Sequence, residues 1–148
     1  SQLIKKGLTL SVAESCTGGL IGKRLTDVVG SSSFFLGGII AYSNDIKVNQ
    51  LSISKELLKK DGAVSQAVAK AMAESIQTIT KGDIAIATTG ISGPSGGTNE
   101  KPVGLVYIAI SYNGNMWVKE FNFFPKRSIH REITSQTALN MVRKIINE

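Results

Sequence analysis

The sequence contains very few soft metal ligands, since it has one cysteine, Cys16, and one histidine, His130. A single cysteine excludes a disulfide framework, and these two residues are too few for a structural zinc site. We therefore expect chemistry that needs neither a metal ion nor another cofactor.

Long apolar runs, internal repeats and low-complexity stretches are also missing. A membrane-spanning helix needs roughly 18 apolar residues, and residues 1–6 lack the apolar stretch of a secretory signal. These absences predict a soluble cytoplasmic protein. With 148 residues, of which 42% are hydrophobic, the chain is predicted to form one domain over residues 1–148 with a sizeable core. It begins with Ser1 rather than Met, as a processed product or a piece of a longer protein would.

The net charge is +6, but the Lys and Arg residues are spread along the chain. No basic block is present, and no aromatic residues are interleaved with the basic ones, as a nucleic-acid surface would require. The charge therefore favours a solvated surface with some bias towards phosphate-bearing ligands, and a nucleic-acid binder is the most distant alternative.

Hydrophobic periodicity predicts alternating strands and helices. Strands are expected over residues 8–13, 34–42, 83–87, 103–112 and 116–124, and helices over residues 20–27, from 44 past 47, 55–60, 65–81 and 128–147. Asn113-Gly114 is a strong hairpin signal between the last two strands. This order predicts an α/β fold, namely a three-layer α/β/α sandwich with a mostly parallel sheet and one antiparallel hairpin.

Finer expectations concern single positions. Two adjacent glycines, Gly37-Gly38, inside a predicted strand indicate a bulge or a close backbone approach. Ser54 and Ser65 are expected to cap helices. The helix after Ser65 is predicted to bury one apolar stripe, formed by Val68, Met72, Ile76 and Ile79.

Polar or glycine-rich clusters follow the predicted strands, at residues 14–19, 42–47 and 88–97, and a further cluster contains Arg127 and Arg131. In an open α/β sheet, ligands bind at the carboxyl ends of the strands. We therefore expect these clusters to form one site.

Ser15 stands at a strand-to-helix turn, which presents its hydroxyl at the end of the sheet. Unpaired N–H groups at the start of the following helix are able to stabilise an oxyanion, as a serine hydrolase requires. In the alternative interpretation Ser15, or Thr17 beside it, only caps that helix.

A serine nucleophile needs a base. Lys47 can serve if burial lowers its pKa, and the Tyr42 hydroxyl would then relay or orient the proton. In the alternative interpretation, Lys47 is a solvent-exposed lysine. Tyr42 then packs its apolar ring against the protein while its hydroxyl faces water. Cys16 is a competing nucleophile that would need His130 as its partner, and a small buried thiol is the simpler explanation of it.

The glycine-rich loop over residues 90–97 suits a backbone that turns its N–H groups towards an anion, although it lacks the ending of a Walker loop. A tight connection is the alternative interpretation. Arg127 and Arg131 are four residues apart, hence on one helix face, and are able to hold a phosphate or carboxylate unless they are surface charges.

Taken in order, these motifs resemble the nicotinamide-nucleotide amidase family, which is the family of the C-terminal domain of the competence/damage-inducible protein CinA. The matching segments are residues 13–19, which read Ala-Glu-Ser-Cys-Thr-Gly-Gly, residues 38–44 with Lys47, residues 62–65, 90–97 and 101–104, and Arg127 with Arg131. One departure is Leu51-Ser52-Ile53, where the family often has Leu-Gly-Val.

The resemblance implies a homodimeric, metal-free amidohydrolase that converts nicotinamide mononucleotide to nicotinic acid mononucleotide and ammonia. It implies Ser15 as nucleophile, Lys47 as catalytic lysine and Tyr42 as their partner. The substrate-binding residues expected from the motifs and the resemblance are Thr17, Gly18, Thr89, Gly90, Ser92, Gly93, Arg127 and Arg131, with the choice between the two arginines open. The main alternative is a non-catalytic nucleotide-binding module, and a cysteine amidase based on Cys16 is a second.

Overall fold

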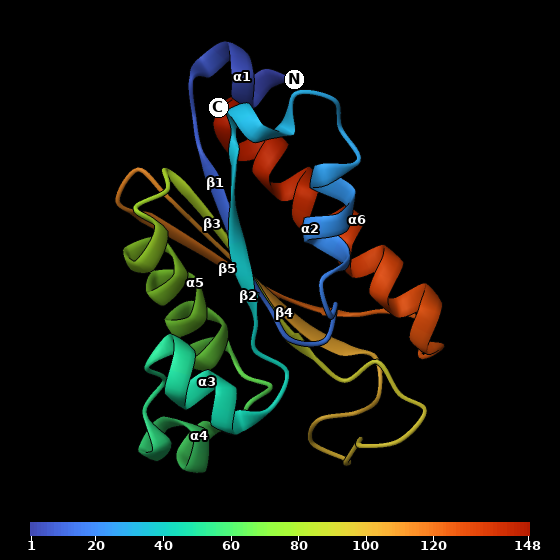
Figure 1. The fold of residues 1–148 in the computed structure, drawn as a ribbon. Helices are drawn as coiled ribbons and strands as arrows, with labels where there is room; N and C mark the ends of the chain where they lie inside the picture. Colours follow the sequence, from blue (N-terminus) through green and yellow to red (C-terminus); the bar gives the residue numbers. More distant parts are fainter.

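A computed structural model describes residues 1–148, which form an α/β structure (Figure 1). The helices are α1 (Gln2–Lys6), α2 (Leu20–Thr26), α3 (Asn44–Leu51), α4 (Lys55–Asp61), α5 (Gln66–Thr80) and α6 (Arg127–Ile146), with a 3-10 turn, η1, at Ser31–Ser33. The strands are β1 (Leu10–Glu14), β2 (Phe35–Ile40), β3 (Ile84–Gly90), β4 (Leu105–Tyr112) and β5 (Asn115–Asn122). None of the helices has the length and apolar character that crossing a membrane would need.

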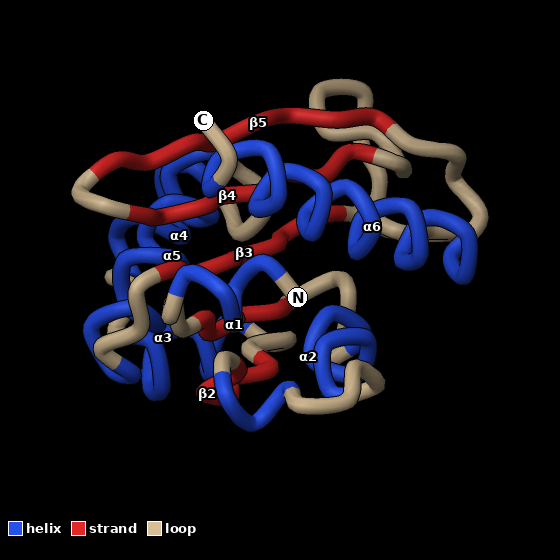
Figure 2. Tube along the Cα trace, turned by 90° about the horizontal axis from the view of Figure 1, so that it is seen from above, coloured by secondary structure: helices blue, strands red, loops and turns tan.

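The five strands form one sheet in the order β2-β1-β3-β4-β5, seen from above in Figure 2. β1 pairs in parallel with β2 and β3, whereas β4 is antiparallel to both β3 and β5. Only β4 therefore runs against the other strands. Helices α3, α4 and α5 cover one face, and α2 and α6 cover the other (Figure 1), which confirms the three-layer α/β/α prediction.

Alternating side chains give each face of the sheet its own apolar cluster. From β3, Ile84 and Ile86 point to the cluster shared with α2 and α6. Ala85 and Ala87 point to the cluster shared with α5. Alanine is small, so most of the volume on that face comes from α5 itself. The sheet thus divides the expected core into two.

Local predictions are confirmed at several positions. Gly38 packs so closely on β1 that an added Cβ would lie 2.2 Å from the Val12 carbonyl oxygen, and the register between β1 and β2 shifts nearby. Ser54 and Ser65 accept hydrogen bonds from the N–H groups at the starts of α4 and α5. Asn113 has φ 53° and Gly114 φ 77°, as a type I′ hairpin turn requires.

The prediction for Ile79 is wrong, because its side chain is 52% exposed. Thr80, four residues after the buried Ile76, takes the inward position and donates a hydrogen bond to the Ser11 hydroxyl. The apolar stripe of α5 therefore ends at Ile76.

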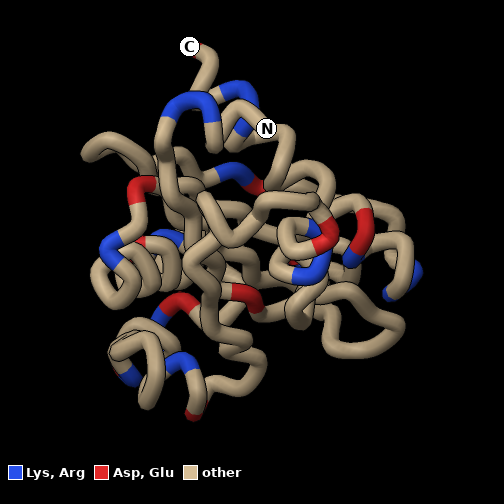
Figure 3. Tube along the Cα trace, turned by 45° about the horizontal axis from the view of Figure 1, so that its top comes forward, with Lys and Arg blue, Asp and Glu red and all other residues tan.

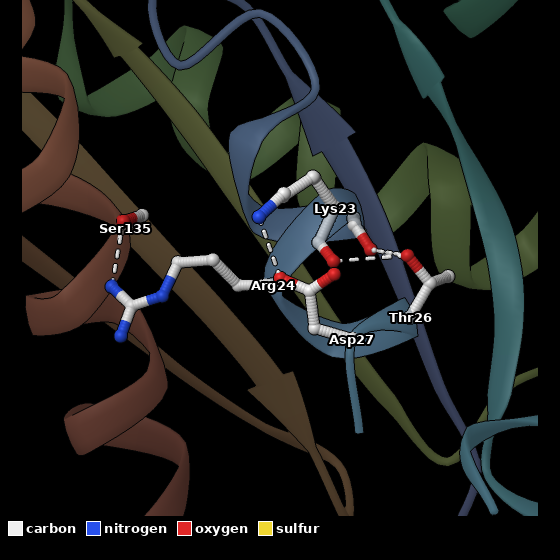
Figure 4. A network of polar contacts seen from close by, with 6 residues as sticks. Lys23, Arg24, Thr26, Asp27 and Ser135 are labelled. Carbon is white, nitrogen blue, oxygen red and sulfur yellow. Dashed lines mark hydrogen bonds and ion pairs between the residues drawn. The ribbon is translucent and has the colours of Figure 1, made fainter. Parts of the chain in front are cut away.

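Polar contacts dock α2 onto α6 (Figure 4). Arg24 donates to the Ser135 hydroxyl, 2.9 Å away, and also to the Gln136 side chain. Lys23 and Asp27 form an exposed ion pair within α2, which contributes little to stability. The docking joins the helix that follows Ser15 to the helix that begins at Arg127. Basic and acidic positions are otherwise interspersed along the trace (Figure 3).

Candidate active site

Ser15 directly follows β1 at the carboxyl edge of the sheet and is only 7% exposed. Its N–H donates to the Thr88 carbonyl at 3.1 Å, which continues the pairing of β1 with β3. Its own carbonyl accepts from the Gly18 N–H at 3.0 Å. Gly18 has φ 60° and Gly19 φ 102°, a region that glycine adopts without strain. The turn therefore holds the Ser15 hydroxyl in a fixed place.

Glu14 determines which N–H groups of this turn are available. Its buried carboxylate accepts hydrogen bonds from the N–H groups of Gly19, Ile21 and Gly22, at 2.9–3.2 Å. The sequence predicted that the N–H groups at the start of α2 are free to bind an oxyanion, and this prediction is too broad because Glu14 already accepts from three N–H groups there. The N–H groups of Cys16 and Thr17 are the ones in the turn without an acceptor in the protein.

Lys47 lies on α3, whose start is capped by the Ser43 hydroxyl. The side chain is 1% exposed, and its Nζ lies 3.1 Å from Ser15 Oγ and 3.0 Å from the Tyr42 carbonyl oxygen. No carboxylate forms an ion pair with it. Burial therefore lowers the pKa of Lys47 below its ordinary value of 10.5. An uncharged amine beside a serine hydroxyl is the arrangement that a general base needs.

Tyr42 meets Lys47 in a different way from the one predicted. The contact uses the Tyr42 main-chain carbonyl, whereas the phenol hydroxyl accepts a 2.6 Å hydrogen bond from the Arg127 guanidinium. The side chain is 57% exposed. Tyr42 thus positions the amine through its backbone and Arg127 through its ring.

A cavity of about 220 Å³ opens in front of Ser15 and Lys47. It is lined by Ser15, Cys16, Tyr42, Asn44, Lys47, Ala63, Val64, Thr89, Gly90, Ser92 and Arg127. Four of the residues predicted to bind substrate thus share the cavity with the Ser-Lys pair. No group of three or more His, Cys, Asp and Glu side chains is arranged to hold a metal ion.

The other predicted binding residues lie behind or beside this cavity. Thr17 is buried, with its hydroxyl 2.8 Å from that of Thr88, and its carbonyl accepts from Arg131 Nη2 at 2.8 Å. Gly18 lies beneath the same guanidinium. The Gly93 carbonyl accepts a 2.9 Å hydrogen bond from Arg127. Arg131 and Arg127 also border an adjacent open hollow with Lys126.

Cys16 and His130 are not a pair. Burial raises the pKa of Cys16 to about 12, and a hydrogen bond with Thr88 offsets only part of that rise. His130 is fully buried and bonds to Ser92 and to the Gly104 carbonyl. The thiol therefore stays protonated at neutral pH and has no imidazole beside it.

Comparison with known proteins agrees with the fold and the motifs. A family model described as the CinA C-terminal domain matches residues 1–146. The chain belongs to this family. It is 49% identical over 144 residues to a CinA-like protein of Desulfotalea psychrophila, covering 97% of this chain and 35% of that protein. A CinA-like protein of Geobacter sulfurreducens is 47% identical over 140 residues, covering 95% and 34%. The chain therefore spans about a third of the length of these relatives.

Solved structures of CinA relatives share the fold. The competence damage-inducible protein A of Klebsiella pneumoniae superposes with a TM-score of 0.96 at 31% identity, covering 99% of this chain and 91% of that chain. The competence/damage inducible protein CihA of Agrobacterium tumefaciens gives 0.95 at 41% identity, covering 99% and 90%.

Sequence reasoning assigned no role to several residues of this CinA domain. Glu14 stands within the most specific string of the sequence, yet the pattern does not reveal that its side chain turns back onto α2. Asn44, Ala63 and Val64 line the cavity. Their segments appear among the motifs of the family resemblance, which is the signal that could have marked them as part of the site.

Proposed function

We propose that this chain hydrolyses the carboxamide of nicotinamide mononucleotide, releasing ammonia and nicotinic acid mononucleotide, and that residues 1–148 act as one amidohydrolase domain in the cytoplasm. The single observation that carries the proposal is the buried Lys47 amine, without an ion-pair partner, 3.1 Å from Ser15 Oγ. Buried lysines without carboxylate partners are rare outside functional sites.

In the proposed reaction, Ser15 Oγ attacks the carboxamide carbon while its proton moves to the neutral Lys47 amine. The Tyr42 carbonyl accepts an N–H of that amine and so keeps its lone pair directed at Ser15. The N–H group of Cys16, which lines the cavity and has no acceptor in the protein, stabilises the oxyanion. Lys47 then protonates the departing nitrogen, and ammonia leaves an acyl-enzyme on Ser15. A water molecule, deprotonated by Lys47, hydrolyses the ester and restores the serine.

The size of the cavity limits which part of the nucleotide enters it. Its volume, about 220 Å³, is below the roughly 300–1,000 Å³ of pockets for whole drug-sized ligands. We therefore assign the cavity to the pyridine carboxamide. The phosphate is assigned to the adjacent hollow, where Lys126, Arg127 and Arg131 gather beside the start of α6.

The test is ammonia release from nicotinamide mononucleotide by the purified chain and its variants. Ser15→Ala and Lys47→Ala are each expected to lose at least about 1,000-fold in turnover, because nucleophile and base act as a unit. Ser95→Ala and Lys59→Ala, both exposed, serve as controls with little change. A wild-type chain that binds the nucleotide without releasing ammonia would instead be the non-catalytic nucleotide-binding module.

We also propose that the chain is a homodimer formed through the outer edge of β2. β2 pairs only with β1, and its segment Phe-Leu-Gly-Gly-Ile-Ile has no charge or proline to guard the free edge. Leu36 is 49% and Ile40 55% exposed. The opposite edge strand, β5, carries Lys119 and Glu120. An antiparallel pairing of β2 with a second copy would bury this apolar strand in both chains.

A further inference from the structure

A buried Ser-His pair lies beside the catalytic residues and is not used by the proposed mechanism. Ser92, in the loop after β3, places its Oγ 2.8 Å from Nδ1 of His130 on α6. The other ring nitrogen, Nε2, lies 3.0 Å from the Gly104 carbonyl oxygen. His130 is 0% and Ser92 5% exposed.

The partners of His130 determine where its proton resides. A carbonyl oxygen only accepts hydrogen bonds, so Nε2 must carry the hydrogen that is donated to Gly104. Burial lowers the pKa of His130 below 6.5, which keeps the ring neutral. Nδ1 is then an acceptor, and the Ser92 hydroxyl must donate its only hydrogen to it.

This arrangement determines whether the Ser92 hydroxyl donates or accepts a hydrogen bond with a ligand. Ser92 lines the same cavity as Ser15, and no other protein group donates to its oxygen. A hydroxyl that has already donated its hydrogen can only accept through its remaining lone pairs. Ser92 is therefore a hydrogen-bond acceptor in the cavity wall and cannot change into a donor while His130 stays neutral.

We infer that Ser92, positioned by His130, selects a carboxamide over a carboxylate in this cavity. The inference rests on the proposed amidase function and assigns a specificity role within it. A carboxamide N–H donates to the Ser92 oxygen, whereas a carboxylate presents negative oxygens to its lone pairs. The contact thus favours binding of the amide substrate and release of the acid product.

The tautomer is tested directly, because His130 is the only histidine of the chain. In a sample labelled with ¹⁵N-histidine, one ring is observed. The inference expects a protonated Nε2 and an unprotonated Nδ1 at pH 7. A protonated Nδ1 overturns it, whatever the activity of the enzyme.

The selectivity is tested by calorimetric titration of nicotinamide mononucleotide and nicotinic acid mononucleotide into Ser15→Ala, which cannot turn the amide over. We expect Ser92→Ala, added to this variant, to reduce the preference for the amide by about tenfold, the value of one hydrogen bond. Ser95→Ala, exposed in the same loop, is the matched control and leaves the ratio unchanged.

Two variants of His130 separate positioning from simple structural support. His130→Asn keeps an acceptor near the Nδ1 position and is expected to retain the preference for the amide. His130→Leu frees the Ser92 hydroxyl to donate and is expected to lose it, while the Gly104 carbonyl still accepts from the Phe123 N–H. Thermal unfolding verifies that both variants fold.

The outcomes distinguish the two proposals. If the wild type releases ammonia but Ser92→Ala leaves the ratio unchanged, the role of Ser92 is overturned and the amidase function stands. If neither nucleotide binds and no ammonia is released, both proposals are overturned.

Discussion

Among single residues, Lys47 has the property on which the proposed chemistry depends, because only the uncharged amine can take the Ser15 proton. Burial lowers the pKa of Lys47 and so favours this uncharged form, and no carboxylate pairs with the amine to oppose the effect. The same burial makes the activity depend on pH in a predictable direction.

We expect kcat/KM to rise with pH through the Lys47 pKa of the free enzyme, which lies below 10.5, and then to level off. Protonated Lys47 cannot act as a base, so below that pKa the rate should fall about tenfold per pH unit. The measurement is kcat/KM for ammonia release between pH 5 and 10. His130→Asn should keep the rising limb, and its disappearance in that variant would assign the limb to the histidine.

Cys16 is the second residue with a clear expectation. Burial raises the pKa of its thiol to about 12, so almost no thiolate exists at pH 7. Cys16→Ala should therefore keep kcat/KM within about tenfold, since the N–H group at position 16 remains. A dead Cys16→Ala beside an active Ser15→Ala would identify a cysteine amidase instead.

At the scale of secondary-structure elements, the end of α3 carries local strain. Ser52 caps the helix with φ 54° and ψ 31°, the left-handed region that costs a residue with a side chain roughly 1–2 kcal/mol. This is the position at which the sequence departs from the glycine often found in the family. The exposed serine therefore occupies a glycine conformation just after the helix that holds Lys47.

Ser52→Gly is expected to raise the free energy of unfolding by about 0.5–1 kcal/mol, the relief of strain less the greater chain entropy of glycine. Urea unfolding measures the change. Ser54→Gly, two residues further on, is the matched control. Ser54 has φ −69° and caps α4, so its replacement should give no gain and cost a few tenths of a kcal/mol. A loss of stability in Ser52→Gly would contradict the interpretation.

The strand before Ser15, the helix that carries Lys47 and helix α5 show which features of the fold and the site the sequence could predict. Periodicity and turn residues predicted the strand before Ser15 and the helix that carries Lys47, because both depend on local spacing. The meeting of these two residues came from the rule that strand ends share one edge of a sheet. Ile79 was misassigned because spacing alone does not decide whether the third or the fourth residue after Ile76 turns inward.

Contacts made through the main chain were beyond prediction. The sequence suggested the Tyr42 hydroxyl as the partner of Lys47, but the partner is the Tyr42 carbonyl, which every residue type would supply. The fold of Glu14 back onto the start of α2 likewise depends on the path of the turn. The Tyr42 contact leaves no trace in the identity of residue 42. The Glu14 contacts need a carboxylate, but the residue types do not reveal which main-chain N–H groups it meets.

At the scale of the whole molecule, the two edges of the sheet differ in how well they are protected from pairing with another strand. β5 has charged side chains, whereas β2 is apolar and paired on one side only. Free apolar edges pair readily with other strands. A monomer would leave this edge exposed beside the site, since β2 leads directly to Tyr42.

We expect sedimentation velocity to give twice the chain mass of 15.8 kDa for the wild type. Leu36→Lys or Ile40→Lys should shift the species to the monomer, because a charge at the edge opposes strand pairing. Ile79→Lys is the matched control, since Ile79 is similarly exposed but lies on α5. A monomeric wild type, or a dimer unaffected by both β2 substitutions, would contradict the proposed interface.

The carbonyl that anchors the Lys47 amine has a consequence for how this protein tolerates genetic change. Every amino acid supplies the main-chain carbonyl that accepts from Lys47. Point mutations at position 42 therefore remove the phenol and its hydrogen bond with Arg127, but they keep the hydrogen bond between the carbonyl and the Lys47 amine. A saturation screen would thus measure at position 42 what the ring does for Arg127 and for the cavity that it lines. The hydrogen bond to the carbonyl would be lost only through changes that redirect the chain, such as a proline or a deletion between β2 and α3.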